Sequence, residues 1–433
     1  MTPFEIGLIA LAGICVLVLS GMFVPIALIF CSFVGLWAIK GSPLLAAKML
    51  GLAANDVIQS YFFGVVPLFV LMGFIVAEAG IGRDAYDVAA AIFRRIKGGL
   101  GVGTVAANAV FAAITGISIA SAAVFTKIAV PEMVRHGYPA RFAAGVVAGS
   151  SVLGMLIPPS LLLILYGLLT EQSIGDLFLA GIGPGIVLAI LFGIGTVFLA
   201  SRDWGRDLPD GGSDLSGGAL IAKAFPIVLL IGVVLGGIYA GFFTPVEAGA
   251  MGALGALVIG LAKRRLSLAA LWRVLVETGL ITAAICFLII AAQMYSRMLA
   301  FSGVPTGFGT FVATAEIGFW GFIALYVLAV ILMGMIIDSA SIMLILVPLM
   351  LPVVQPMGID LIWFGIVTVI AVEIGLLTPP FGISVYVIKS TLDDDSITLG
   401  EIFRGAAPFA GMMVVALLLV ILFPIIATFP LGY

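Results

Sequence analysis

A near-continuous succession of apolar segments constrains the fold of this chain more than any other feature. Of its 433 residues, 63% are hydrophobic and only 9% are charged, whereas about 25% of the residues of an ordinary soluble domain are charged. A soluble core of this size would need a charged outer shell that 19 basic and 22 acidic side chains are too few to supply. Most of the apolar surface must therefore face lipid, and we expect an all-α polytopic membrane protein.

The same composition argues against several classes of function. A net charge of −3, with no basic stretch interleaved with aromatic residues, argues against nucleic acid as a partner. Cys15, Cys31 and Cys286 lie in apolar runs without paired spacing, so we expect neither a disulfide nor a metal framework. The sequence contains no GxxxxGK(S/T) phosphate loop and no HExxH motif. We therefore expect neither an enzyme nor a cofactor, and any energy that the protein uses must come from an ion gradient or another subunit.

Gly, Pro and charged residues divide the chain into apolar runs. These runs cover residues 5–22, 24–39, 58–79, 100–133, 140–170, 176–200, 219–241, 245–262, 280–299, 318–354, 361–391 and 402–427. The start of the chain lacks the basic stretch of a secretory signal, so we expect the first helix to be retained. The one long hydrophilic stretch, near the midpoint, is rich in Gly, Asp and Ser. We therefore predict a first repeat over 1–200, a linker over 201–218 and a second repeat over 219–433.

Two runs, 100–133 and 318–354, are much longer than the roughly 20 residues that one crossing needs. Each carries Gly and polar residues near its middle, which predicts a re-entrant helical hairpin with its tip near Gly116 or Gly334. A run with a proline pair follows each hairpin: Pro158-Pro159 within 140–170, and Pro379-Pro380 within 361–391. Proline lacks an N–H and clashes with the carbonyl group four residues earlier, so both runs are predicted to be broken helices. Their recurrence predicts an internal repeat.

Charge indicates that the second repeat is inverted. With three helices, a hairpin, a broken helix and a last helix, each half crosses the membrane an odd number of times, and most Lys and Arg residues then share one face. These are Arg83, Arg94, Arg95, Lys97, Lys127, Arg135, Arg141, Arg202, Arg206, Lys223, Lys263, Arg264, Arg265, Arg273, Lys389 and Arg404. The positive-inside rule makes that face cytoplasmic and both termini external. The run Arg94–Lys97 fits equally well an amphipathic arm on the membrane surface.

Ionisable residues inside apolar segments are costly and therefore candidates for function. They are Glu78, Glu247, Glu277, Arg297, Glu316, Asp338, Glu373 and Lys389. Asp338 lies at the expected tip of the second hairpin, where it could cap the following helix, bind an ion, or do both. Arg297 could either snorkel to the interface or pair with an anionic substrate. His136 is the only His, and it is expected in a cytoplasmic loop. The ligands available inside the membrane are therefore hard oxygen atoms, which favour Na⁺ over a soft metal.

Six strings in this sequence resemble one family. They are VPLFVLMG (66–73), AVPEMVRHGY (129–138), GMLIPPS (154–160), FLAGIGPG (178–185), FTPVEA (243–248) and GLLTPPFG (375–382). They are similar to the large membrane subunit of TRAP transporters, the tripartite ATP-independent periplasmic carriers. The resemblance implies the fold of the ion-transporter superfamily and a multi-pass protein of the bacterial inner membrane. It also implies Na⁺-driven import of a small organic anion by an elevator mechanism.

The resemblance further implies two partners, a small four-helix membrane subunit and a periplasmic substrate-binding protein. A stand-alone sodium/dicarboxylate symporter of the same fold is the alternative, and a channel is a second one. Because the hairpin tips are expected to meet the helix breaks, we predict the ion-binding and substrate-binding sites there. The resemblance implies that the ion is Na⁺. The predicted sodium-binding residues are Gly116, Ser118, Gly154, Gly334, Asp338, Ser339, Gly375 and Thr378. The predicted substrate-binding residues are Pro159, Ser160, Arg297, Asp338, Ser341 and Pro380.

Overall fold

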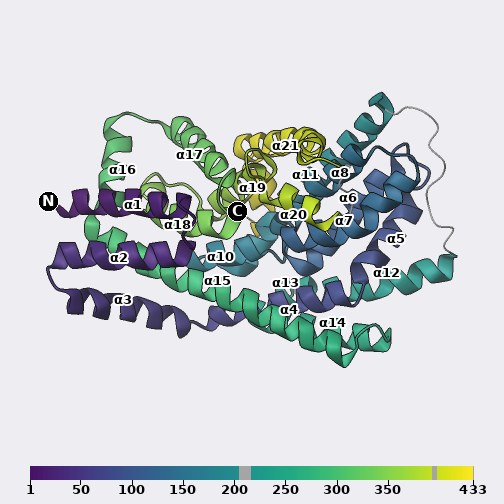
Figure 1. Cartoon of the computed structure of the whole chain (residues 1–433), viewed down its shortest axis with the longest axis horizontal. Coiled ribbons are helices and arrows are strands. Elements are labelled where there is room, and N and C mark those ends of the chain that lie inside the picture. Colours follow the sequence, from purple (N-terminus) through teal and green to yellow (C-terminus); the bar gives the residue numbers. More distant parts are fainter. Residues whose placement is uncertain (204–215, 393–396, 433) are drawn as a thin grey trace.

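The computed structural model describes residues 1–203, 216–392 and 397–432, and these residues form helices and connecting turns with no strand (Figure 1). The first half contains α1 (Pro3–Leu19), α2 (Val24–Lys40), α3 (Pro43–Ile58), η1 (Tyr61–Gly64), α4 (Val65–Glu78), α5 (Ile81–Phe93), α6 (Gly99–Thr115), α7 (Ser118–Arg135), α8 (Ala140–Ser151), α9 (Leu153–Leu156), α10 (Leu161–Thr170) and α11 (Ile174–Asp203). The second contains α12 (Gly217–Ile231), η2 (Gly232–Gly236), α13 (Gly237–Tyr239), α14 (Pro245–Ala262), α15 (Leu268–Ser302), α16 (Val304–Thr314), α17 (Phe319–Gly334), α18 (Ser339–Val354), α19 (Leu361–Leu377), α20 (Ile383–Thr391), α21 (Leu399–Leu422), α22 (Ile425–Thr428) and η3 (Phe429–Leu431).

Within the described residues, six helices are long and apolar enough to cross a bilayer, or seven if the bent pair α4 and α5 counts as one span. Six shorter apolar helices accompany them, among them the arms α6, α17 and α18 of the predicted hairpins. The prediction of an all-α polytopic membrane protein is therefore confirmed. Most of the predicted linker 201–218 lies outside the described residues.

Three helices begin with the same local signal. Thr2, Thr244 and Thr398 each accept a hydrogen bond from the backbone N–H of a Glu three residues later, and that Glu carboxylate accepts one from the Thr backbone. This capping box satisfies amide groups that the first turn of a helix leaves free. It fixes the starts of α1, α14 and α21.

The hairpins and the broken helices occur where the sequence predicts them. The turn at Gly116 separates α6 from α7, and the turn at 335–338 separates α17 from α18. The first proline pair separates α9 from α10, and the second separates α19 from α20. In Figure 1, α8 lies nearer than α10 to the end that carries α5, whereas α20 lies nearer to it than α19. The two broken helices therefore run in opposite directions, as expected for inverted repeats.

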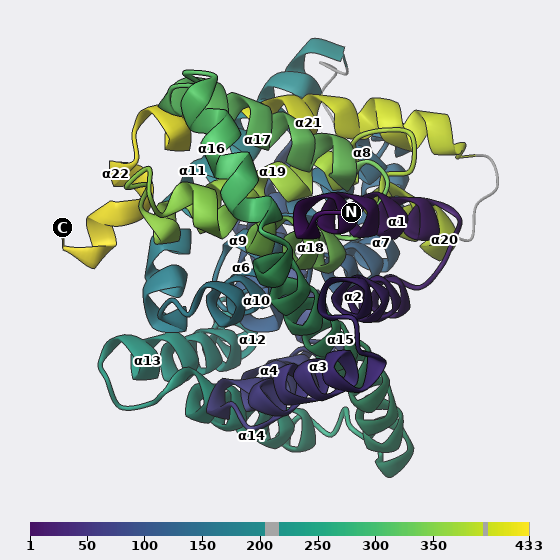
Figure 2. The same ribbon diagram turned by 90° about the vertical axis from the view of Figure 1, so that its left-hand side faces the viewer.

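The helices pack in two groups. Helix α15 runs along α1, α2, α3 and α4, and α4 also contacts α14; these helices form the first group (Figures 1 and 2). The second group contains both hairpins and both broken helices, with contacts between α8 and α21, α10 and α18, and α17 and α19. Contacts of α4 with α6, and of α15 with α18, join the groups. We call the first group the scaffold and the second the hairpin unit.

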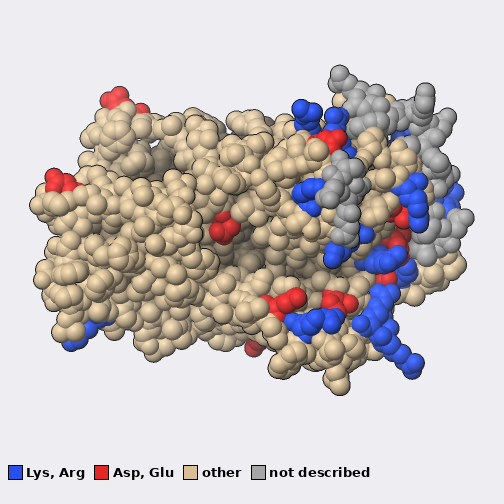
Figure 3. Space-filling model, in the orientation of Figure 1, with Lys and Arg blue, Asp and Glu red and all other residues tan. Residues whose placement is uncertain are grey.

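Basic side chains gather at one end of the molecule. Figure 3 shows most Lys and Arg residues at the end where α5 and α12 lie, and Figure 1 shows the N-terminus at the opposite end. The positive-inside rule assigns the basic end to the cytoplasm. Arg94–Lys97 follow α5, which bends 64° away from α4. An amphipathic arm at Arg94–Lys97 stays a prediction.

Several helix boundaries differ from the predicted apolar runs. The run 280–299 is part of α15, a helix of 35 residues that also contains Arg273 and Glu277. Those charges lower the local hydropathy, so the predicted run begins too late. In the structure Arg273 makes an ion pair of 2.8 Å with Glu78 of α4. Helix α3 was not predicted, because Lys48, Asn55 and Asp56 interrupt its apolar pattern.

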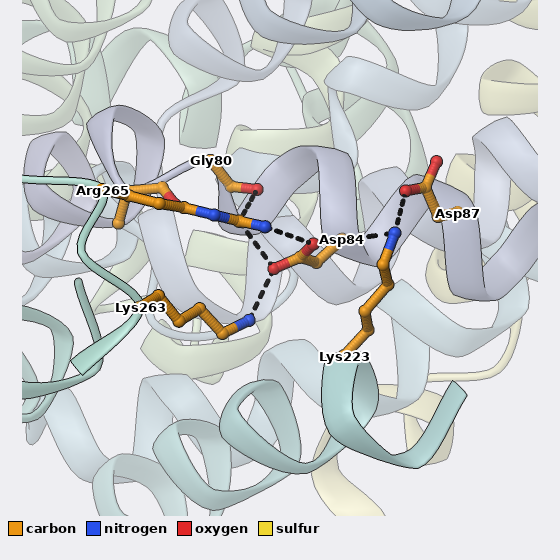
Figure 4. Close-up of polar contacts among 7 residues, drawn as sticks. Gly80, Asp84, Asp87, Lys223, Lys263 and Arg265 are labelled. Carbon is orange, nitrogen blue, oxygen red and sulfur yellow. Dashed lines mark hydrogen bonds and ion pairs between the residues drawn. The ribbon is translucent and has the colours of Figure 1, made fainter. Parts of the chain in front are cut away.

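A buried ion-pair cluster joins the two halves at the basic end (Figure 4). The Asp84 side chain on α5 is 1% exposed, and it lies 2.6 Å from Lys263 Nζ and 2.8 Å from an Arg265 guanidinium nitrogen. Arg265 also donates to the carbonyl groups of Ala79 and Gly80. Lys223 of α12 pairs with Asp87 one turn further along α5. The cluster therefore fixes the start of α5 against the turn between α14 and α15.

We predict that Asp84→Ala lowers the free energy of unfolding by about 3 kcal/mol, because it leaves two cations without their buried partner. The measurement is thermal unfolding of the full chain in detergent. Glu78→Gln is the matched control: it breaks the exposed pair with Arg273, which is worth less than about 1 kcal/mol. Equal losses in the two variants would contradict the assigned role of Asp84.

Candidate ion and substrate site

The tip of the first hairpin rests against the first helix break. Gly116 ends α6 with a φ of +65°, a left-handed conformation that favours glycine. Its carbonyl accepts a hydrogen bond of 3.1 Å from the N–H of Leu161, just after the proline pair. A Cβ on Gly116 would overlap the Pro159 carbonyl oxygen, and one on Gly154 would lie 3.1 Å from the Ser118 nitrogen. The turn and the helix break are therefore in contact through their backbone atoms at this tip.

The tip of the second hairpin repeats this arrangement. The Met335 carbonyl, one residue after Gly334, accepts a hydrogen bond of 3.2 Å from the N–H of Phe381, just after the second proline pair. A Cβ on Gly334 would lie 2.8 Å from the Gly375 Cα atom. Thr378 ends α19, and its hydroxyl donates to the Ile374 carbonyl at 2.7 Å. Both repeats thus pair a hairpin turn with a backbone amide just after the proline pair of a broken helix.

The structure brings most predicted sodium-site residues to these two places. Gly116, Ser118 and Gly154 lie together at the first tip, and Gly334 and Gly375 touch at the second. Asp338 is the N-cap of α18 and accepts from the Ser341 backbone N–H at 3.0 Å and from its hydroxyl. The capping interpretation of Asp338 therefore holds in the structure, and a role in ion binding stays a prediction.

The predicted substrate residues are more scattered. Ser160 is buried, and it caps α10 while its hydroxyl donates to the Met155 carbonyl. Pro159 is buried against Gly116, whereas Pro380 is exposed. The first break is thus covered and the second is open at the surface.

Arg297 lies apart from the tips, in a cleft of about 520 Å³ between the scaffold and the hairpin unit. Its guanidinium group makes an ion pair of 3.0 Å with Asp56 at the end of α3. The cleft is also lined by Gln293 from α15, and by Glu171 and Gln172 between α10 and α11. The Arg297 side chain is 36% exposed, so it is accessible to a solute in this cleft.

Glu373 is the site residue that the sequence did not single out. It lies on α19 and is 1% exposed, and one of its carboxylate oxygens accepts a hydrogen bond from the Ser339 hydroxyl at 3.3 Å. The sequence marks Glu373 only as one ionisable residue among several in apolar segments. Its proximity to the hairpin depends on how α19 packs, which no local pattern contains.

Comparisons with known proteins agree on one family. A family model described as "Tripartite ATP-independent periplasmic transporter, DctM component" matches residues 11–426. The C4-dicarboxylate TRAP transporter large permease protein DctM of Pseudomonas aeruginosa is 32% identical over 383 residues, covering 88% of this chain and 89% of that protein. The sialic acid TRAP transporter large permease protein SiaM of Vibrio cholerae is 31% identical over 411 residues, covering 94% of each.

A solved structure has a similar fold. The YdaH transporter of Alcanivorax borkumensis superposes with a TM-score of 0.60, covering 89% of each chain, at 13% sequence identity. At that identity the likeness concerns the fold alone. It supports the arrangement of helices described above.

We predict that Gly116→Ala disrupts the first tip, because the residue combines a positive φ with a backbone carbonyl in the space a Cβ would need. The expected loss of stability is on the order of 1–3 kcal/mol. Thermal unfolding in detergent measures it. Gly411→Ala on α21 is the control, since nothing lies within 4 Å of the position that its new methyl group would occupy. A Gly116→Ala protein as stable as the control variant would contradict this description of the tip.

Proposed function

The chain belongs to the DctM family of TRAP transporter large membrane components, and on this premise we propose that it is the sodium-coupled import subunit for a small organic anion. The family is one of multi-pass inner-membrane transporters, not enzymes. It works with a periplasmic binding protein and a small membrane subunit. For this chain, the anion, the coupling ion and the two partners are parts of the proposal.

The observation that carries the proposal is the duplicated tip. In each repeat a helix break presents non-helical backbone to a hairpin turn inside the hairpin unit. Such backbone is tolerated at membrane depth only where it is buried in protein or lines a cavity, and its carbonyl groups are hard oxygen ligands. Buried hydroxyl and carboxylate oxygens without hydrogen-bond partners, on Ser118 and Glu373, add ligands of the same class. This donor set suits Na⁺.

The two-group packing supports an elevator mechanism. The hairpin unit contains both candidate ion sites and contacts the scaffold through a few helices. At one contact Gly73 of α4 lies so close to the first tip that a Cβ would be 3.2 Å from the Thr115 carbonyl oxygen. Because glycine has no side chain, Gly73 does not interlock with the tip, which favours sliding of one surface past the other. We propose that the hairpin unit moves past the scaffold with its bound ions and anion.

The first test is uptake into membrane vesicles with the family's three components supplied in every combination. We expect uptake only with Na⁺ outside and with the binding protein present. K⁺ in place of Na⁺ should abolish it, since K⁺ is too large for a compact oxygen site. Uptake without the binding protein would favour a stand-alone symporter, and uptake that follows the solute gradient alone would favour a channel. Unchanged uptake in K⁺ would refute sodium coupling.

The second test concerns Arg297 as the main positive contact for the anion. The guanidinium group has five N–H donors and the pair with Asp56 uses one nitrogen, so a carboxylate in the cleft can bind the rest. We expect Arg297→Ala to lose uptake and Arg297→Lys to lose much of it, because lysine lacks the fork geometry. Asp56→Asn, which keeps the guanidinium group, should retain uptake. Full activity in Arg297→Ala, at matched membrane abundance, would show that Arg297 does not bind the anion.

A further inference from the structure

Glu373 is positioned to contact both hairpins at once. It lies two residues before Gly375, on the stretch of α19 that touches the second tip. Ser339, which donates to its carboxylate, is the first residue of α18. Ser118 is the first residue of α7, the corresponding helix of the other hairpin, and its hydroxyl lies beside the same carboxylate. One carboxylate of the second repeat therefore faces the serine that opens the second arm of each hairpin.

The hydrogen bonds around this carboxylate are incomplete. The second carboxylate oxygen of Glu373 is buried and has no hydrogen-bond partner. The Ser118 hydroxyl is also fully buried without one, so its approach to Glu373 does not form a well-aligned hydrogen bond. Burying polar oxygens without partners costs on the order of 1–3 kcal/mol each, and more for a charged group. A carboxylate oxygen and a hydroxyl oxygen therefore lie at one place with capacity to bind a ligand.

The negative charge of the Glu373 carboxylate is also not fully compensated by its surroundings. Among the described residues, no Lys, Arg or His forms an ion pair with Glu373 or with Asp338, the residue next to Ser339. The positive end of α18 is already bound by the Asp338 carboxylate, which caps it. The N-terminal end of α7 has no side-chain cap, and the N-terminal end of a helix contributes only about half a positive charge. A buried carboxylate needs more compensation than this.

We propose that Glu373 is a direct ligand of a coupling Na⁺ ion, which it shares with the hydroxyl groups of Ser118 and Ser339. This inference rests on the proposed sodium coupling and adds a charged ligand to the backbone and hydroxyl oxygens of the tips. A monovalent cation balances the single carboxylate, and all the available ligands are hard oxygens. Because the serines belong to different hairpins, the ion connects the two repeats within the hairpin unit.

The experiment measures Na⁺ binding without transport. The full chain, purified in detergent, is unfolded by heat in mixtures of NaCl and choline chloride at constant ionic strength, and the midpoint of the Na⁺-dependent stabilisation is recorded. We expect the stabilisation of the wild type to saturate with rising NaCl concentration, which defines its midpoint. Glu373→Gln keeps the size of the side chain but removes its charge, and should raise that midpoint by about tenfold or more.

Two further variants make the result specific. Thr368→Val is the matched control on α19, because Thr368 is buried and polar but bonds to Tyr326 instead of the hairpin serines; its midpoint should be unchanged. Ser118→Ala removes a hydroxyl that makes no well-aligned hydrogen bond, so it should fold normally and raise the midpoint several-fold. It replaces Glu373→Gln if that variant is too unstable to purify.

The outcomes separate the two proposals. Saturable stabilisation in the wild type, together with a wild-type midpoint in Glu373→Gln or in Ser118→Ala, overturns the role of Glu373 and leaves sodium coupling intact. A wild type that responds equally to NaCl and choline chloride overturns sodium coupling itself, and the role of Glu373 with it. Raised midpoints in both variants, with Thr368→Val unchanged, support the shared site.

Discussion

Inside a bilayer, every backbone N–H and C=O group that leaves a helix must find a partner within the protein. This chain leaves its helices at four such places, two hairpin turns and two proline-pair breaks, and in each repeat one backbone hydrogen bond joins the turn to the break. Leu161 donates to Gly116 in the first repeat, and Phe381 donates to Met335 in the second. These two bonds hold each hairpin turn against a helix break, where its backbone is buried in protein.

The glycines at the tips make this pairing possible. Gly334 and Gly375 touch where α17 crosses α19, and Gly116 and Gly154 allow the first turn to meet the first break. The same closeness brings the ends of α7 and α18 toward α19, where Glu373 lies. The two repeats differ in their surroundings, since the first break is buried and the second is exposed at Pro380.

The sequence predicts the parts of this arrangement that are local or periodic. Excess length shows the two hairpins, the proline pairs show the two breaks, and the positive charges show the cytoplasmic end. Pairings between distant residues have no such signal. Asp84 and its partners Lys263 and Arg265 lie in different halves, and the contact of Ser118 with Glu373 joins two repeats. The predicted run 280–299 covers only part of α15 for a related reason, because Arg273 interrupts the apolar pattern and its partner Glu78 lies far away in the sequence.

The central claim is that the two hairpin tips and the two helix breaks form one ion-binding unit. An experimental density map of the full chain in NaCl tests it most directly, with a second map in choline chloride as the reference. The account predicts both turns seated on their breaks, and density for an ion in contact with Glu373 and Ser118 in the NaCl map alone. Tips separated from the breaks, or identical density around Glu373 in both salts, would contradict it.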